Sequence, residues 1–136
     1  MAIEDDVRAA ADRFYAALNE SFSGNTGPMD EQWSHSTTVS TMLPSGGRQI
    51  GWDEVRPTWT TLAPDASADT GLTSVTVPDL VVIPVTDDVA YILGTDHLEG
   101  KMGGQPIAVQ VRTTILFHRG EDGWKVVHRH GDALSR

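Results

Sequence analysis

The segment near the end of the chain carries side chains whose spacing suits acid–base chemistry. In residues 124–132 (WKVVHRHGD), His128, His130 and Asp132 alternate with Arg129. Alternate side chains of a β-strand point to the same face, so His128 and His130 share one face and Arg129 lies on the other. If the histidines line a pocket, they can move protons near neutral pH with Asp132 beside them. If Arg129 lines it instead, it serves as an anion clamp.

Two further candidates for proton transfer or hydrogen bonding lie earlier in the chain. His97 follows Tyr91 by six residues on a predicted strand, so both side chains project to one side and could face the same cavity. We regard His97 as the best single catalytic candidate. Tyr15 lies at the edge of a predicted apolar helical stripe, where its hydroxyl could enter the same space as a hydrogen-bond donor.

Aromatic residues in the first half of the chain are candidates for substrate binding. Trp33 and Trp59 could contact a flat or apolar ligand, and His35 would add a polar group at the mouth of the pocket. Tyr91 and Arg129 complete the predicted substrate-binding set.

The same histidines could in principle hold a metal. The pair His128 and His130, with His97 or Asp132, has a spacing that suits zinc, iron or nickel on a strand. A cupin would use such a pair, but helices ahead of the strands argue against that fold. The chain has no cysteine, which excludes disulfides, thiolate nucleophiles and cysteine-type zinc sites. We therefore predict no metal and no cofactor.

The elements that must position these residues follow from apolar periodicity. Residues 3–22 predict an amphipathic helix, and residues 29–34 a short second one. Residues 37–50 predict a hairpin, and residues 52–62 a helix that Pro57 kinks or shortens. From Thr70 onward the pattern predicts four long strands. We expect an α+β fold in which three helices close a curved sheet around a concave space.

Composition limits the classes of partner. The chain has 136 residues with 39% hydrophobic content, which predicts one domain spanning residues 1–136. Its 19 acidic and 10 basic residues give a net charge of −9, which would repel nucleic acid. No apolar run approaches a membrane span of about 20 residues, and the start MAIEDD is acidic where a signal peptide is basic. We expect a cytoplasmic protein with no membrane partner.

Several segments resemble the nuclear transport factor 2-like superfamily, and within it the SnoaL-like and ketosteroid-isomerase-like proteins. Besides the helical start, the matching segments are 46–55 (GGRQIGWDEV), 89–91 (VAY), 112–114 (RTT) and 123–130 (GWKVVHRH). The resemblance implies a cone-shaped, curved mixed or antiparallel sheet packed by three helices. The tail also resembles the association domain of calcium/calmodulin-dependent kinase II, which favours the arrangement with Arg129 inward and the histidines at an interface.

The resemblance leaves two functions open because this fold hosts many. The first is a cofactor-independent isomerase, cyclase or dehydratase that acts by acid–base chemistry on a small apolar organic molecule. The second is a non-catalytic ligand-binding or oligomerisation module. Where a ketosteroid isomerase has its carboxylate base, this chain has Thr41, which disfavours that reaction. We also expect a homodimer formed through the sheet, because a monomer would expose Val126 and its strand neighbours.

Overall fold

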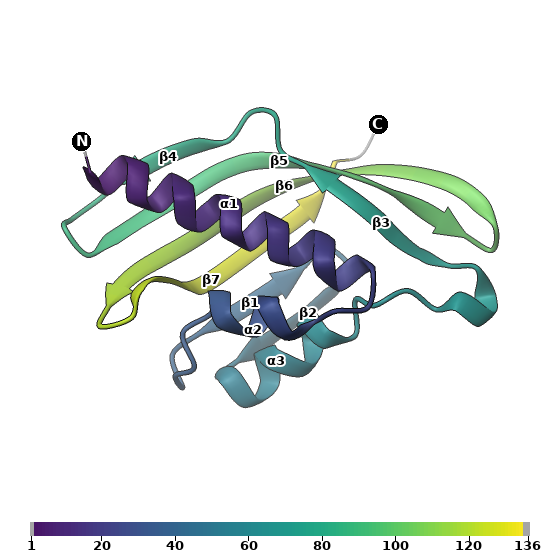
Figure 1. The fold of residues 1–136 in the computed structure, drawn as a ribbon, viewed down its shortest axis with the longest axis horizontal. Helices are drawn as coiled ribbons and strands as arrows, with labels where there is room; N and C mark the ends of the chain where they lie inside the picture. Colours follow the sequence, from purple (N-terminus) through teal and green to yellow (C-terminus); the bar gives the residue numbers. More distant parts are fainter. Residues whose placement is uncertain (1, 135–136) are drawn as a thin grey trace.

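The computed structural model describes residues 2–134 and shows helices packed on one curved, seven-stranded sheet (Figure 1). The elements in chain order are α1 (Ala2–Phe22), α2 (Gly27–Gln32), β1 (Ser40–Leu43), β2 (Gly46–Ile50), α3 (Trp52–Thr60), the 3-10 helix η1 (Ala66–Ala68), β3 (Gly71–Thr76), β4 (Val81–Pro84), β5 (Val89–Met102), β6 (Gln105–Gly120) and β7 (Gly123–Ala133). The predicted α+β class is confirmed. None of the described helices is long and apolar enough to cross a membrane.

The longest helix, α1, forms where the apolar stripe was predicted. Val7 and Phe14 are fully buried on the face that packs against the sheet, as the three- and four-residue spacing requires. Asn19 joins the helix to β3, because its side-chain amide donates to the Val75 carbonyl at 3.2 Å and accepts from the Val75 N–H at 3.0 Å. The helix is thereby held along one side of the sheet.

The hairpin and the third helix are also found, with shorter bounds than the sequence suggested. The hairpin strand begins at Ser40 rather than at residue 37. Helix α3 ends at Thr60, and Pro57 lies inside it. Because proline has no N–H to donate, one bond of the helical ladder is missing there. Val55 and Trp59 of α3 point into the core and are at most 2% exposed.

The sheet has the order β2-β1-β7-β6-β5-β3, with β4 also paired to β5. It is mixed, since β1 and β7 are parallel and the other pairs are antiparallel. The first of the four long strands predicted from Thr70 onward is instead two separate strands, β3 and β4. Pro78 lies in the gap and cannot donate to a ladder. Opposite the gap, the carboxylate of Asp79 accepts the Thr95 N–H at 2.8 Å in place of a strand.

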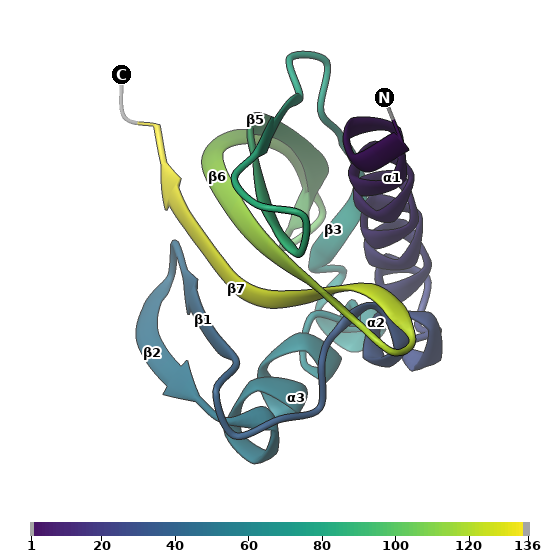
Figure 2. The same cartoon turned by 90° about the vertical axis from the view of Figure 1, so that its left-hand side faces the viewer.

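The sheet has an inner face toward the helices and an outer face away from them (Figure 2). A β-bulge in β7 sets which residues face inward: Leu116 pairs with His128, but the next residue, Phe117, pairs with Val126. Val126 and Arg129 are consequently both buried, at 0% and 4% exposed. The expectation that a monomer would expose Val126 is therefore wrong, because the bulge turns this residue into the core.

Candidate functional site

The inner face of the sheet carries a buried ion pair between two long strands. Arg129 on β7 donates from Nη2 to Oδ2 of Asp96 on β5 at 3.1 Å, and their side chains are only 5% and 1% exposed. The intervening strand β6 contributes Thr113, whose hydroxyl oxygen accepts from the same nitrogen at 3.4 Å. Buried charges are retained when they are paired and hydrogen-bonded, as they are here.

Helix α1 extends this pair into a chain of three polar side chains. The Tyr15 hydroxyl donates to Oδ1 of Asp96 at 2.8 Å. Burial raises the pKa of Tyr15 well above its ordinary value, and the negative charge of Asp96 adds to the rise. Tyr15 is therefore held as a protonated phenol, which can donate a hydrogen bond but does not serve as a base near neutral pH.

Two neighbours confine the Arg129 guanidinium, and a third binds the Arg129 backbone. Its carbon Cζ lies 5.5 Å from the centre of the Trp59 ring, a cation–π contact. At Gly131, an added Cβ would lie 2.8 Å from Nη1 of Arg129, so the absent side chain leaves room for the guanidinium. Thr41, fully buried on β1, donates its hydroxyl to the Arg129 carbonyl at 3.3 Å.

Several N–H groups around Arg129 are buried without an acceptor. They are Nε of Arg129 and the indole nitrogens of Trp59 and Trp33. The rings of Trp33 and Trp59 are 5.8 Å apart between centres, so the three side chains form a continuous row. A buried donor without a partner is costly, and each such group in a native structure calls for an explanation.

The concave space predicted between the layers is filled by side chains in this structure. Tyr15 is 8% exposed, Trp59 2% and Asp96 1%. Four hollows of about 450 to 600 Å³ open on the surface of the described residues, and none of these four is lined by Tyr15, Trp59, Asp96 or Arg129. A molecule that reached Arg129 would have to displace an interior side chain.

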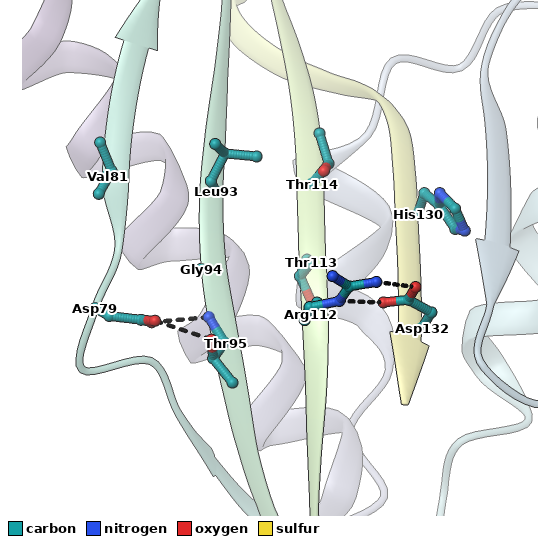
Figure 3. A pocket seen from close by; sticks show the side chains of 10 residues that line it. All are labelled: Asp79, Val81, Leu93, Gly94, Thr95, Arg112, Thr113, Thr114, His130 and Asp132. Atoms are coloured by element: carbon teal, nitrogen blue, oxygen red, sulfur yellow. Dashed lines mark hydrogen bonds and ion pairs between the residues drawn. The ribbon is translucent and has the colours of Figure 1, made fainter. Parts of the chain in front are cut away.

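The outer face carries a different set of polar groups around a hollow of about 520 Å³ (Figure 3). Arg112 donates to both carboxylate oxygens of Asp132, at 3.1 and 2.7 Å, and both side chains are about half exposed or more. The hydrogen bonds from Arg112 lower the pKa of Asp132. Asp79 is likewise bound to Thr95, through its N–H and its hydroxyl. The carboxylates of this hollow already have partners.

The histidines of β7 also lie on the outer face. Nδ1 of His128 is 2.7 Å from the Ser40 hydroxyl, and His130 lines the hollow of Figure 3. Burial lowers the pKa of His128, with a smaller contribution from the nearby charge of His130, whose ring centre is 6.5 Å away. The alternative in which both histidines line the interior with Asp132 is therefore wrong, because the bulge places Arg129 there instead.

His97 and Tyr91 share one side of β5, but it is the outer one. His97 lines a hollow of about 600 Å³ together with Gln110, Val109 and Leu134. The residue before it, Asp96, takes the inward position. The prediction that His97 and Tyr91 face a cavity under the helices is wrong, because strand alternation directs both side chains away from Tyr15.

The aromatic candidates of the first half are divided between two places. Trp33 and Trp59 are in the core row beside Arg129. His35 stacks on Trp52, with ring centres 4.2 Å apart and planes at 8°, and together with Trp33 it lines a hollow of about 530 Å³. Over residues 2–134, no group of three or more histidine or acidic side chains is arranged to hold a metal ion.

Asp96, Thr113 and Thr41 complete the buried cluster, but sequence reasoning did not select Asp96 or Thr113 and noted Thr41 only as the residue in place of a carboxylate base. One signal could have found Asp96: it is in phase with Ala90, Ile92 and Leu98, which are all buried, so strand alternation places its carboxylate in the core. A buried carboxylate needs a partner. No comparable signal marks the two threonines.

Known structures share this architecture. A candidate dehydratase of the nuclear transport factor 2-like family from Streptomyces avermitilis matches with a TM-score of 0.81 and 22% identity, over 99% of this chain and 98% of that one. A protein from Exiguobacterium sibiricum, named for the calcium/calmodulin-dependent kinase II association domain, matches with a TM-score of 0.74 and 18% identity, over 100% and 96%. A ketosteroid isomerase-like protein from Erwinia carotovora atroseptica matches with a TM-score of 0.75 and 13% identity, over 98% and 97%.

At these identities the likeness shows the fold alone, and these structures have the nuclear transport factor 2-like and ketosteroid isomerase-like descriptions that the sequence resemblance implied. None of the curated proteins matches the chain in sequence. The family model described as the SnoaL-like domain matches residues 7–133. The chain is therefore a member of the SnoaL-like domain family.

Proposed function

We propose that this protein binds a small organic molecule in its interior, against Arg129 and Trp59. The observation that carries the proposal is the row of buried N–H donors that lack acceptors, at Arg129, Trp59 and Trp33. A core built only for stability would satisfy these groups or replace them with apolar side chains. A ligand with an acceptor atom beside them would satisfy them.

The same cluster could support acid–base catalysis without a cofactor, of the isomerase, cyclase or dehydratase kind. Tyr15, held as a phenol, can donate a hydrogen bond to an oxygen that gains negative charge. Asp96 is the adjacent carboxylate that could accept a proton. Both oxygens of Asp96 are engaged by Tyr15 and Arg129, so a substrate must take one of these bonds before Asp96 can react.

Access to the interior requires movement of Trp59. Its ring lies between Arg129 and Trp33, with centre distances of 5.5 Å to Arg129 Cζ and 5.8 Å to the Trp33 ring. It belongs to α3, a helix of nine residues whose ladder is interrupted by Pro57. Displacement of this ring would open a space of side-chain size beside the unpaired donors.

Titration of small aromatic compounds against ¹⁵N-labelled protein tests the proposal. The indole N–H signal of Trp59 reports directly on the interior, and that of Trp33, which also lines the 530 Å³ hollow, is read together with it. Both signals are assigned with Trp→Phe variants. We expect at least one compound of a fragment set to shift both signals in a saturable way, and Arg129→Met to abolish the shift.

Arg112→Met is the matched control, because Arg112 is the exposed arginine of the outer face. It is expected to leave the titration unchanged. Shifts confined to surface residues, or shifts that survive in Arg129→Met, would contradict a binding site in the interior.

A second candidate function is assembly through the outer face, which would make the protein a homodimer. The observation that favours it is the exposure of large apolar side chains on this face: Val81 is 52% exposed and its strand partner Leu93 41%. Light scattering at micromolar concentration is expected to give twice the chain mass, and Leu93→Glu is expected to give the monomer. A monomeric wild type would contradict the dimer.

A further inference from the structure

The charges of the interior cluster cancel. Arg129 contributes one positive charge and Asp96 one negative charge, and the two are in direct contact at 3.1 Å. Tyr15 adds no charge, because burial raises its pKa and holds it as a phenol. Any charge on a ligand would therefore enter the interior without a countercharge, and this is disfavoured in a medium of low dielectric constant.

In the same cluster, buried donors lack hydrogen-bond partners, whereas the carboxylate acceptors have them. The groups without partners are donors: Nε of Arg129 and the indole nitrogens of Trp59 and Trp33. The acceptors are occupied, since Oδ1 of Asp96 accepts from Tyr15 and Oδ2 accepts from Arg129. The site therefore offers a ligand N–H groups to bind to but no free carboxylate oxygen.

From these two properties we infer that the ligand of this interior site is a neutral aromatic compound with an acceptor oxygen, such as a ketone, ester or lactone. This inference rests on the proposed function and names the ligand class for it. A carboxylate of the same shape would bring a second negative charge beside Asp96, and an ammonium compound would meet the Arg129 charge and find both Asp96 oxygens engaged. A hydrocarbon of the same shape would leave the donors unsatisfied.

The surrounding side chains specify the aromatic body. Trp59 lies edge-on to Phe14, with ring centres 5.7 Å apart and planes at 81°, and is tilted by 47° against Trp33, with ring centres 5.8 Å apart. All three rings are at most 2% exposed. A flat ring that replaces or joins Trp59 keeps these aromatic contacts, whereas a polar or branched body loses them.

Three probes with the same ring separate the possibilities: acetophenone is neutral with an acceptor, benzoate is charged, and ethylbenzene has no acceptor. Each is titrated into ¹⁵N-labelled wild-type protein while the Trp33 and Trp59 indole signals are followed. We expect acetophenone to bind at least about tenfold more tightly than either of the others, as the difference of about one satisfied buried donor implies.

The charge argument is tested separately by Asp96→Asn, which removes the countercharge of Arg129 and keeps the side-chain shape. The preference is then expected to reverse, with benzoate binding more tightly than acetophenone and raising the melting temperature of the variant. Asp79→Asn is the matched control on the outer face, where the carboxylate is bound to Thr95. It is expected to keep the wild-type order.

The outcomes distinguish this inference from the proposed function. If benzoate or ethylbenzene shifts the two indole signals as strongly as acetophenone in the wild type, the interior binds ligands but the inferred class is wrong. If none of the three shifts them up to their solubility limits, both are overturned. The wild-type comparison stands by itself if Asp96→Asn does not fold, and an unchanged order in a folded Asp96→Asn protein overturns the charge argument.

Discussion

Two arginine–aspartate pairs lie on opposite faces of the same part of the sheet, and their surroundings differ. Arg129 and Asp96 are on the inner face, at 5% and 1% exposed, under α1 and α3. Arg112 and Asp132 are on the outer face, at 66% and 49% exposed. The outer pair has the better geometry, with two hydrogen bonds between guanidinium and carboxylate. Water, however, can hydrogen-bond to the polar atoms of this exposed pair that have no protein partner.

The difference shows why the inner pair is the better candidate for function. An exposed ion pair in water contributes little, and its loss changes little. Water does not reach a buried pair, so each of its unpaired donors carries the full free-energy cost of lacking an acceptor. On this basis the donors around Arg129, rather than the histidines of the outer face, are the place to look for a ligand.

The largest effect is expected for Arg129→Met. This substitution removes one partner and leaves the Asp96 carboxylate buried without its countercharge, which costs about 3–5 kcal/mol of unfolding free energy. Urea denaturation followed by tryptophan fluorescence measures the loss. Arg112→Met, on the outer face, is expected to unfold at the same urea concentration as the wild type. Equal losses in the two variants would remove the distinction between the pairs.

A smaller effect is expected for Tyr15→Phe. The substitution keeps the ring but removes a hydrogen bond to a charged group, which contributes about 1.5–3 kcal/mol. The same denaturation measurement applies, with Tyr91→Phe on the outer face as the control for loss of a phenol. A stability equal to that of the control would show that Asp96 does not depend on Tyr15.

Gly131→Ala perturbs Arg129 while its charge is kept. The new Cβ would lie 2.8 Å from Nη1 of Arg129 and 2.8 Å from Val111 Cγ1, so the guanidinium must shift. Overpacking of this kind costs about 1–3 kcal/mol. Gly120→Ala is the control, since nothing lies within 4 Å of its added Cβ. If the two alanine variants are equally stable, Arg129 is not confined as the structure indicates.

The smallest effect concerns His128 and is a change in pH dependence. Burial lowers the pKa of His128 in the folded state below its ordinary value of 6.5. Below about pH 6.5 the unfolded chain therefore binds a proton that the folded chain resists, and the free energy of unfolding falls as the pH falls. We expect His128→Gln to flatten this fall between about pH 7.5 and 5.5, and to do so more than His118→Gln. A steeper fall in His128→Gln would contradict the direction of the shift.

Much of the fold could be predicted from the sequence, because it depends on periodicity. The stripe that includes Val7 and Phe14 predicted α1, and the alternation through Val111 and Ile115 predicted a sheet with one apolar face. The bounds of the shorter elements were less accurate. The break between β3 and β4 shows why. It depends on Asp79, whose side chain binds the N–H of Thr95 on another strand, and local periodicity does not report such a contact.

The site was harder to predict because it depends on which face of each strand turns inward. The bulge in β7 adds a residue between Val126 and Arg129, and two-residue alternation alone cannot place both of them in the core. His97 attracted attention by its chemistry, whereas its neighbour Asp96 occupies the inward position. The contact from Tyr15 to Asp96 joins residues 81 positions apart, and no local pattern reports such a pairing.

A crystal structure of the wild-type protein soaked with acetophenone tests the central claim most directly. The account predicts a displaced Trp59 ring and a carbonyl oxygen within about 3.2 Å of Nε of Arg129 or of an indole nitrogen. Acetophenone bound only in the outer hollow beside His130, with the interior packed as it is here, would contradict the account.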